Sequence, residues 1–239
     1  MRVVIDADVI TYRVAWSCED RKTGDVDPDY VLYGRINNQI HEILEALQTT
    51  DYQLYLTGPN NFRYDIYPGY KANRPPKPKL YEAARIYMIS KWGAVVTDGI
   101  EADDALSIEG SMDEANVCIA SIDKDLLQIP CWHYNFVKGK LFKQDYDTAI
   151  RSFYAQLLMG DATDSIPGIK GIGPVKAGKL LQGTVTEYDM LQICVEQYRE
   201  HYGEEWKQAI LCNGRLLYML RDPTDMWGEI LDGSYHTED

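Results

Sequence analysis

Nine carboxylates stand in four groups whose spacing suits the binding of divalent metal ions. The groups are Asp6 with Asp8, Glu101 with Asp103 and Asp104, Asp123 with Asp125, and Asp161 with Asp164. So many negative charges in one place would repel each other unless cations lay between them. Oxygen ligands select hard cations, so the groups predict two Mg²⁺ or Mn²⁺ ions rather than zinc. Paired ions of this kind are typical of enzymes that hydrolyse phosphodiester bonds.

Each acidic group taken alone also has a structural interpretation. Acids in the first turn of a helix complement the helix dipole, which would account for Glu101–Asp104. Asp123 would serve as the cap of a short helix over Asp125–Gln128. Asp161 and Asp164 would serve as turn residues. Four such groups meeting at one edge of a sheet favour the metal site over these separate interpretations.

Short apolar runs alternate with helical patterns in the part of the chain that holds the first three groups. Strands are expected at Arg2–Ile5, Gln53–Leu56, Ala94–Thr97 and Asn116–Ser121. Helices are expected at Tyr30–Leu47, Leu80–Trp92 and Ala102–Met112. This alternation predicts an α/β body over residues 1–145, with a central, mostly parallel sheet flanked by helices. Because parallel strands end at the same edge, the acids that follow them should meet there.

After Asp145 the pattern becomes mostly helical. Helices are expected at Tyr146–Met159, Pro174–Leu181, Thr186–Tyr202 and Glu204–Leu220. We therefore expect a helical portion over residues 146–239 that packs against the body, with fraying from Trp227 onward. The clearest irregular piece of the body is the proline-rich run Arg74–Lys79.

The composition indicates a globular protein and excludes several other classes. With 45% hydrophobic and 26% charged residues, the chain can bury a sizeable core. No apolar run approaches the roughly 20 residues of a membrane helix, and carboxylates stand where a signal peptide is apolar. The five cysteines are scattered, and the four histidines lack metal-ligand spacing. These features predict a cytoplasmic protein without a membrane partner.

Two basic stretches stand out in a chain whose formal net charge is −13. The total charge argues against non-specific binding of nucleic acid, but it hides the distribution. Residues 70–91 carry six basic side chains against Glu82 alone, and Ile169–Gly183 carries three lysines and no acid. Charge alone would allow both stretches to be solvated surface.

The second basic stretch has a form that suits phosphate binding. Gly171 and Gly173 make a tight turn that opens a helix, with Pro174 at the first helical position. Such a turn presents backbone N–H groups to a phosphate, while Lys176 and Lys179 add positive charge. Nothing in this arrangement reads bases, so it predicts a grip that is independent of sequence.

Five motifs, in this order along the chain, resemble those of the 5′ nuclease family. The family includes flap endonucleases, phage 5′–3′ exonucleases and the 5′-nuclease domain of bacterial DNA polymerase I. The motifs are Val4–Asp6, Tyr70–Pro76, Gly99–Ala105, Ser121–Asp125 and Gly160–Gly173. The resemblance covers Met1 to about Gly183. It implies a PIN-like body with an arch segment near residues 70–92 and a helix–three-turn–helix near residues 160–182.

The resemblance also implies roles for individual residues. The matching metal-site carboxylates are Asp6, Glu101, Asp103, Asp104, Asp123, Asp125, Asp161 and Asp164. Lys71 and Arg74 match basic residues that contact the scissile phosphate, beside catalytic Asp6, Asp103, Asp104 and Asp123. Tyr70 is expected to stack on a terminal base. DNA contacts are also implied for Lys170, Gly171, Gly173, Lys176 and Lys179, together with a K⁺ ion held by backbone carbonyls there.

This chain departs from the family pattern at one acidic position. An Asp usually follows the second strand, where Thr57 stands here. Asp8 is an extra acid two residues after Asp6, and positions two apart on a strand share a face. Asp8 is therefore expected to compensate as a metal ligand.

The function implied is Mg²⁺-dependent hydrolysis of DNA at or near 5′ ends or 5′ flaps, in replication or repair, by a monomer in a bacterial or phage-infected cell. Two alternatives stay open. One is a related nuclease that acts on RNA or RNA–DNA hybrids. The other is a catalytically silent module that binds branched DNA, which a broken acidic set would favour.

Overall fold

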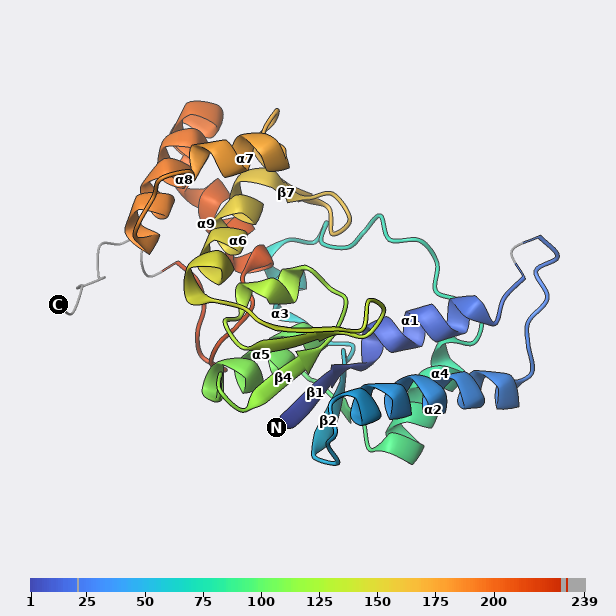
Figure 1. Cartoon of the computed structure of the whole chain (residues 1–239). Helices are drawn as coiled ribbons and strands as arrows, with labels where there is room; N and C mark the ends of the chain where they lie inside the picture. The colour runs from blue at the N-terminus through green and yellow to red at the C-terminus, as the bar shows by residue number, and fades with distance from the viewer. Residues whose placement is uncertain (21, 229–230, 232–239) are drawn as a thin grey trace.

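A mixed six-stranded sheet forms the centre of the computed structural model, which describes residues 1–20, 22–228 and 231. Its strands are β1 (Arg2–Asp6), β2 (Tyr52–Leu56), β3 (Val95–Val96), β4 (Val117–Ala120), β5 (Trp132–Asn135) and β6 (Lys140–Lys143). They lie in the order β3-β2-β1-β4-β5-β6, and only β6 is antiparallel to its neighbour. The prediction of an α/β fold with a mostly parallel sheet is confirmed (Figure 1).

Helices cover both faces of this sheet. On one face lie α1 (Ala7–Ser17), α2 (Asp29–Ala46) and α4 (Tyr81–Trp92); α5 (Ala102–Met112) lies on the other. Alternation along β1 explains the two layers, because successive side chains of a strand point to opposite faces. Val3 and Ile5 pack with the first set of helices, whereas Val4 packs with Leu106 of α5.

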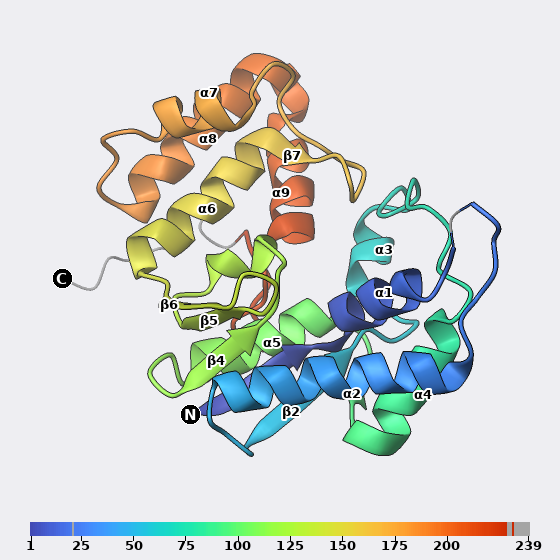
Figure 2. The same cartoon turned by 45° about the vertical axis from the view of Figure 1, so that its right-hand side comes forward.

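The helical portion has its own core and lies above the sheet in Figure 2. Its helices are α6 (Tyr146–Met159), α7 (Pro174–Leu180), α8 (Glu187–Tyr202) and α9 (Trp206–Leu217). A small hairpin, β7 (Gly160–Asp161) and β8 (Ile166–Pro167), separates α6 from α7. Gly160 and Gly168 allow the two ends of this hairpin to approach each other closely. A Cβ atom on Gly168, for example, would lie 1.9 Å from the Met159 carbonyl oxygen. Elsewhere in the described residues the chain forms three short helical pieces, α3 (Phe62–Ile66), η1 (Asp125–Gln128) and η2 (Gly203–Glu205).

The structure corrects three expectations about the elements. α1, α3 and the hairpin of β5 and β6 were not expected from the sequence pattern. α4 packs against α1 and α2, so only residues 70–80 of the expected arch segment are irregular. We call the irregular residues 67–80, between α3 and α4, the strap. Trp227 is buried against Phe153 instead of fraying, and residues 229, 230 and 232–239 lie outside the described part.

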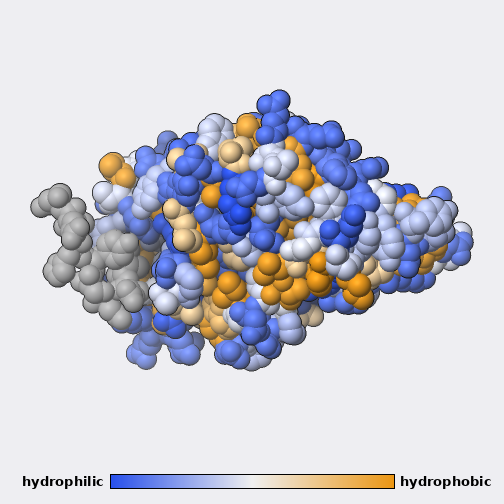
Figure 3. All heavy atoms as spheres, turned by 90° about the horizontal axis from the view of Figure 1, so that it is seen from below, coloured by the Kyte–Doolittle hydropathy of each residue, from blue (hydrophilic) through white to orange (hydrophobic). Residues whose placement is uncertain are grey.

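The surface over α2 and α4, viewed from below in Figure 3, mixes hydrophilic areas with smaller apolar patches. Exposed apolar side chains include Ile86 and Ile89 of α4 and both valines of β3. Among the described residues, no helix combines the length and the apolar character needed to cross a membrane.

Candidate active site

Two adjoining hollows lie at the carboxyl edge of the sheet. The larger, of about 430 Å³, is lined by Asp6 and Asp8, and the smaller, of about 180 Å³, by Asp125, Asp161 and Asp164. Four residues line both hollows: Arg74, Glu101, Asp103 and Asp123. The structure therefore brings eight of the nine predicted carboxylates to one place.

Asp6 lies at the end of β1 and caps α1. Its Oδ1 accepts a hydrogen bond from the Val9 N–H at 2.9 Å, and its Oδ2 accepts one from the Ser121 hydroxyl at 2.6 Å. Only 1% of Asp6 is exposed. Burial raises the pKa of Asp6 to about 7, and the charges of Asp8 and Asp123 act in the same direction.

Asp103 and Asp123 face Asp6 from two other elements. Asp103 lies in the first turn of α5, and Asp123 follows β4. Burial, and then the carboxylates of Asp6 and Asp123, raise the pKa of Asp103 well above its ordinary value. Asp123 is held by two bonds, since its N–H donates to Ser121 Oγ at 3.0 Å and its Oδ1 accepts from the Asp125 N–H at 2.9 Å. The charge of Asp123 therefore opposes the ionisation of both Asp6 and Asp103.

Glu101 is also buried, but its nearest charged neighbours are cations rather than carboxylates. Its Oε1 accepts from Lys71 Nζ, its Oε2 accepts from the Tyr70 hydroxyl at 2.8 Å, and Arg63 lies 3.6 Å away. Burial would raise the pKa of Glu101, but the charges of Lys71 and Arg63 outweigh burial and lower it. Glu101 is therefore ionised and paired with cations in this structure.

Tyr70 does not occupy the place expected for a base-stacking residue. Its ring is 3% exposed and belongs to the core of the helical portion, while its hydroxyl is directed to Glu101. A buried ring offers no free face to a nucleotide base. The expectation that Tyr70 stacks on a terminal base is wrong for this structure, and Tyr70 instead orients Glu101.

The smaller hollow joins the body to the helical portion. Asp161 Oδ1 accepts from the Thr163 N–H at 2.7 Å, and Arg74 Nη2 donates to Asp164 Oδ1 at 2.6 Å. Asp125 lies beside Asp123, and burial, followed by that neighbouring charge, raises the pKa of Asp125 to about 7. Acids from residues 123–125 thus meet acids from the hairpin of β7 and β8.

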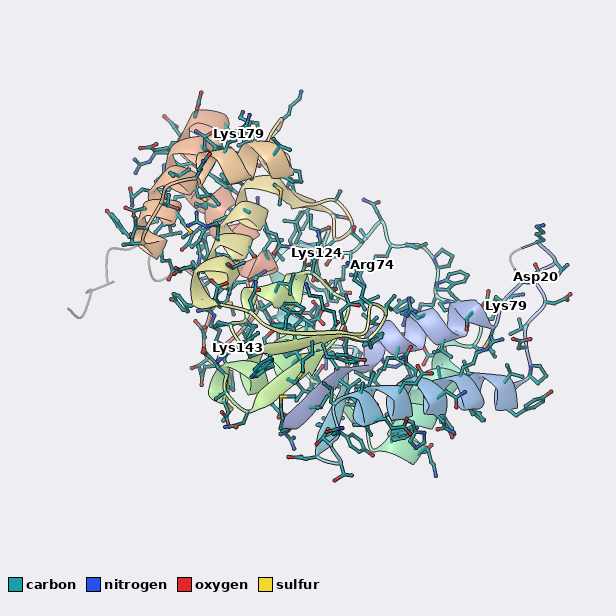
Figure 4. All side chains as sticks on the ribbon, in the orientation of Figure 1. Asp20, Arg74, Lys79, Lys124, Lys143 and Lys179 are labelled. Carbon is teal, nitrogen blue, oxygen red and sulfur yellow. The ribbon has the colours of Figure 1, made fainter. Side chains whose placement is uncertain are left out.

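Lys124 spans this hollow and was not recognised as a site residue from the sequence. Its Nζ lies 3.4 Å from Asp161 and 4.0 Å from Asp125, although 71% of its side chain is exposed. In the sequence, the only indication that Lys124 belongs to the site is its position between Asp123 and Asp125. Figure 4 shows Lys124 and Arg74 near each other in this region.

Asp104 is the one predicted carboxylate that the structure does not bring to the hollows. Its two oxygens accept from the guanidinium of Arg63 at 2.5 and 2.8 Å, and both side chains are fully buried. Arg63 also donates to the backbone oxygens of Leu216 and Tyr218. The prediction of Asp104 as a catalytic metal ligand therefore disagrees with its place, which is a buried ion pair that joins α5 to α3 and α9. No sequence signal pointed to Arg63.

Asp8 reaches the hollow by a route different from the one expected. It lies in the first turn of α1, so it does not share a strand face with Asp6. Its Oδ2 accepts from the Thr57 N–H at 2.9 Å, and its Oδ1 accepts from Arg85 at 3.2 Å. Arg85 also donates to the Thr57 carbonyl oxygen. The carboxylate of Asp8 therefore stands at the end of β2, beside the position where an Asp was expected.

Comparisons with known proteins agree with this geometry. Residues 1–159 match the family model described as the 5′-3′ exonuclease, N-terminal resolvase-like domain. The chain belongs to this 5′ nuclease family. It is 32% identical over 181 residues to a DNA polymerase I of Rhizobium leguminosarum, an alignment that covers 67% of this chain and 17% of that protein.

Two shorter relatives have names that refer to a nuclease. A 5′-3′ exonuclease of Buchnera aphidicola is 27% identical over 72% of this chain and 66% of its own length. The flap endonuclease Xni of Pseudoalteromonas translucida is 28% identical over 66% of this chain and 68% of its own length. The chain thus spans about two thirds of these relatives and a small part of the polymerase.

Solved structures show the same fold. The phage T5 D15 protein, crystallised with metal ions, has a TM-score of 0.66 at 15% identity and covers 90% of this chain and 88% of its own. The catalytic core of Rad2 in complex with a DNA substrate has a TM-score of 0.52 at 14% identity. That match covers 85% of this chain and 66% of the Rad2 chain.

The predicted DNA-binding residues of this 5′ nuclease lie on the helical portion. Lys170, Gly171, Gly173, Lys176 and Lys179 are all exposed, and Gly171 has a φ of 84° that favours glycine. Figure 4 places Lys179 on the upper part of the molecule, apart from Arg74 and Lys124. The structure thus separates these residues from the acidic hollows.

The donor set of the hollows fits hard divalent cations. Asp6, Asp103 and Asp123 supply carboxylate oxygens whose mutual repulsion a bound cation would relieve. In the part of the chain that the structure describes, no three His, Cys, Asp or Glu side chains already surround a single point. The reason is visible in the contacts, because Lys71, Arg74 and Lys124 pair with acids that a metal would otherwise neutralise.

Proposed function

We propose that this 5′ nuclease hydrolyses DNA phosphodiester bonds at or near 5′ ends or 5′ flaps with the help of two divalent metal ions. The observation that carries the proposal is the meeting of Asp6, which is buried, with the half-buried carboxylates of Asp103 and Asp123 in a hollow bordered by Lys71 and Arg74. The charge of Asp123 helps to raise the pKa values of both Asp6 and Asp103. The names of the exonuclease and flap endonuclease relatives support cleavage from 5′ ends or at flaps, and the name of the DNA polymerase I relative supports DNA as the substrate.

The two hollows would divide the metal ligands between them. Asp6, Glu101, Asp103 and Asp123 would hold one Mg²⁺ or Mn²⁺ ion, with Asp8 adding negative charge at the end of β2. Asp125, Asp161 and Asp164 would hold the second, together with Asp123. Bound ions of this kind activate water and stabilise a leaving oxygen. We assign Asp104 to the buried ion pair instead.

Lys71 and Arg74 would bind the oxygens of the scissile phosphate. Both lie on the strap, and each now neutralises an acid, Lys71 at Glu101 and Arg74 at Asp164. If bound metal ions neutralised Glu101 and Asp164, the Lys71 ammonium and the Arg74 guanidinium would become available to a phosphate. Positive groups aimed at phosphoryl oxygens stabilise the charge that develops there during hydrolysis.

The helical portion would hold duplex DNA through its backbone. The turn at Gly171 and Gly173 presents N–H groups, and Lys170, Lys176 and Lys179 supply positive charge. The hairpin of β7 and β8 followed by α7 is the segment that would form the helix–three-turn–helix and its K⁺ site. Contacts to phosphates alone suit a role in replication or repair, where any sequence must be accepted.

A cleavage assay with end-labelled substrates tests this function. A 5′-flap duplex, a blunt duplex, a single strand and an RNA–DNA hybrid would each be incubated with Mg²⁺, with EDTA and with Asp123→Ala. We expect release of products from the 5′ end or flap that requires both Mg²⁺ and Asp123. Absence of cleavage together with tight binding of the flap substrate would instead indicate a catalytically silent DNA-binding module.

A further inference from the structure

The hairpin of β5 and β6 carries lysines that no part of the proposed mechanism uses. Between Asp125 and Asp145 the chain contains three lysines and no acid, although its net charge is −13. The lysines are Lys138, Lys140 and Lys143, and all three are exposed. None of them forms an ion pair with the residues that the structure describes. Their charge is therefore available to a partner.

The turn of this hairpin lies at the same edge of the sheet as the acidic hollows. β5 runs parallel to β4, so Asn135 at its end is on the carboxyl edge. Near that end, the Tyr134 carbonyl oxygen accepts from the Ser121 N–H at 3.2 Å, and Ser121 in turn donates to Asp6. Since Asn135 pairs with Lys140 and Trp132 pairs with Lys143, Lys140 lies at the site edge and Lys143 at the opposite end.

The turn is held in a defined shape. Asn135 Oδ1 accepts from the N–H groups of Val137 and Lys138 at 3.2 and 2.9 Å, and Gly139 takes a φ of 60°. The ammonium of Lys140 lies 5.4 Å from the centre of the Phe142 ring. A lysine on a structured turn loses less entropy on binding than one on a mobile loop.

Protection of the sheet edge explains only part of this arrangement. β6 is an edge strand, and lysines on such strands hinder pairing with other chains. That role suits Lys140 and Lys143, which are on the strand. It does not apply to Lys138, which is in the turn and faces no strand partner.

We propose that the turn of the β5–β6 hairpin, through Lys138 and Lys140, binds the phosphate backbone of duplex DNA beside the active site. The inference rests on the proposed function. Glu101 follows β3 and holds the strap through Lys71. In the strand order, β3 and the β5–β6 hairpin lie on opposite sides of β1. A duplex that crosses the acidic hollows from the strap would meet the hairpin next, and lysines recognise its phosphates without reading bases.

The salt dependence of DNA binding tests this contact. Fluorescence anisotropy with a labelled 5′-flap duplex would be measured in EDTA, so that no strand is cut, from 50 to 200 mM salt for wild type, K138Q, K140Q and K143Q. We expect K138Q and K140Q each to bind about five- to tenfold more weakly near 0.1 M salt and to reduce the salt slope by about 0.9. The matched control K143Q, on the same hairpin but at the far edge, should behave as wild type.

The outcomes separate this inference from the function on which it depends. Wild-type affinity and slope in K138Q and K140Q, or an equal loss in K143Q, would overturn the hairpin contact even if the wild-type enzyme cuts DNA. A wild-type chain that neither binds nor cuts the flap duplex would overturn both. Thermal unfolding of each variant shows whether the exposed substitutions leave the fold intact. Figure 4 shows Lys143 well separated from Lys124 and Arg74, as the control requires.

Discussion

Two adjacent residues, Asp103 and Asp104, have opposite environments in this structure. Asp103 lines both hollows and is repelled by Asp6 and Asp123, whereas Asp104 is fully buried in an ion pair with Arg63. Successive residues on a helix point about 100° apart, so one turn of α5 delivers one carboxylate to the hollow and the other to the core. The same residue type therefore serves chemistry at one position and stability at the next.

Exchanging each of these acids for Asn separates the two roles. Asp104→Asn removes the charge that accepts both short Arg63 bonds and leaves only Glu101, 3.6 Å away, to balance that buried cation, so the free energy of unfolding should fall by about 3 kcal/mol. Asp103→Asn removes a repelled charge, so the metal-free protein should be at least as stable, while cleavage should fall by a factor of at least about 100. Chemical denaturation and single-turnover rates measure the two effects. Equal stability losses in both variants would contradict the assignment.

The carboxylates whose pKa values are raised also predict how the free energy of unfolding varies with pH. The pKa values of Asp6 and Asp125 are about 7 in the folded chain, above the ordinary value of 3.8. The folded state therefore binds more protons than the unfolded state, and stability falls as pH rises from about 4 through 7. In EDTA, the midpoint of thermal unfolding should be lower at pH 8 than at pH 5.5.

Divalent metal should reverse this trend, because it neutralises the ionised acids. The stabilisation by 5 mM Mg²⁺ should be larger at pH 8 than at pH 5.5, and Asp125→Asn should reduce the loss of stability with pH in EDTA. The pKa values of Glu101 and Asp161 are lowered, so these two acids make stability rise with pH. Their effect falls at more acidic pH than the range from pH 5.5 to 8. A midpoint that rises between pH 5.5 and 8 in EDTA would contradict the account.

Among the elements, the strap has the most direct influence on the site. Residues 67–80 are irregular, yet Lys71 and Arg74 are fixed to Glu101 and Asp164. Lys71 has a φ of 57°, an uncommon value for a residue with a side chain, which agrees with a position determined by its contacts. The strap thus holds two cations over the acids that they are expected to leave when a metal and a phosphate bind.

Lys71→Ala should affect turnover more than binding. We expect single-turnover cleavage to fall by a factor of about 100, since one charge-stabilising donor is lost, while affinity for the flap duplex in EDTA changes by less than about fivefold. Lys143→Ala provides a control for loss of one exposed lysine. A loss of affinity as large as the loss of rate would assign Lys71 to substrate binding instead.

The sequence predicted the elements of the body better than their contacts. The first strand, the helix at Ala102–Met112 and the acids after the strands were correctly located, because apolar runs and helical spacing are local signals. The pairing of Arg63 with Asp104 is not local, since 41 residues separate the two. Burial of Tyr70 depends on the helical portion packing over the strap, which no local pattern records.

On the scale of the whole molecule, the site is built where the body meets the helical portion. Asp123 and Asp125 come from the sheet edge, and Asp161 and Asp164 come from the hairpin before α7. The smaller hollow therefore exists only when the two parts pack together. Basic residues of the strap line the site, and further exposed lysines lie on α7 and on the β5–β6 hairpin, although the chain as a whole is acidic. If the proposed function is right, the acidic remainder of the surface would confine DNA to the parts of the molecule that carry these basic residues.

The number of Mn²⁺ ions bound per chain tests the central claim most directly. Titration of the wild-type chain at pH 8, with free Mn²⁺ followed by electron paramagnetic resonance, should give two ions, and Asp161→Asn should lose or weaken the second while keeping the first. Because Asp161 lines only the smaller hollow, the two sites are distinguishable. Binding of no Mn²⁺ by the wild-type chain, or of one ion that Asp161→Asn and Asp103→Asn leave unchanged, would contradict the two-ion site proposed for the acidic hollows.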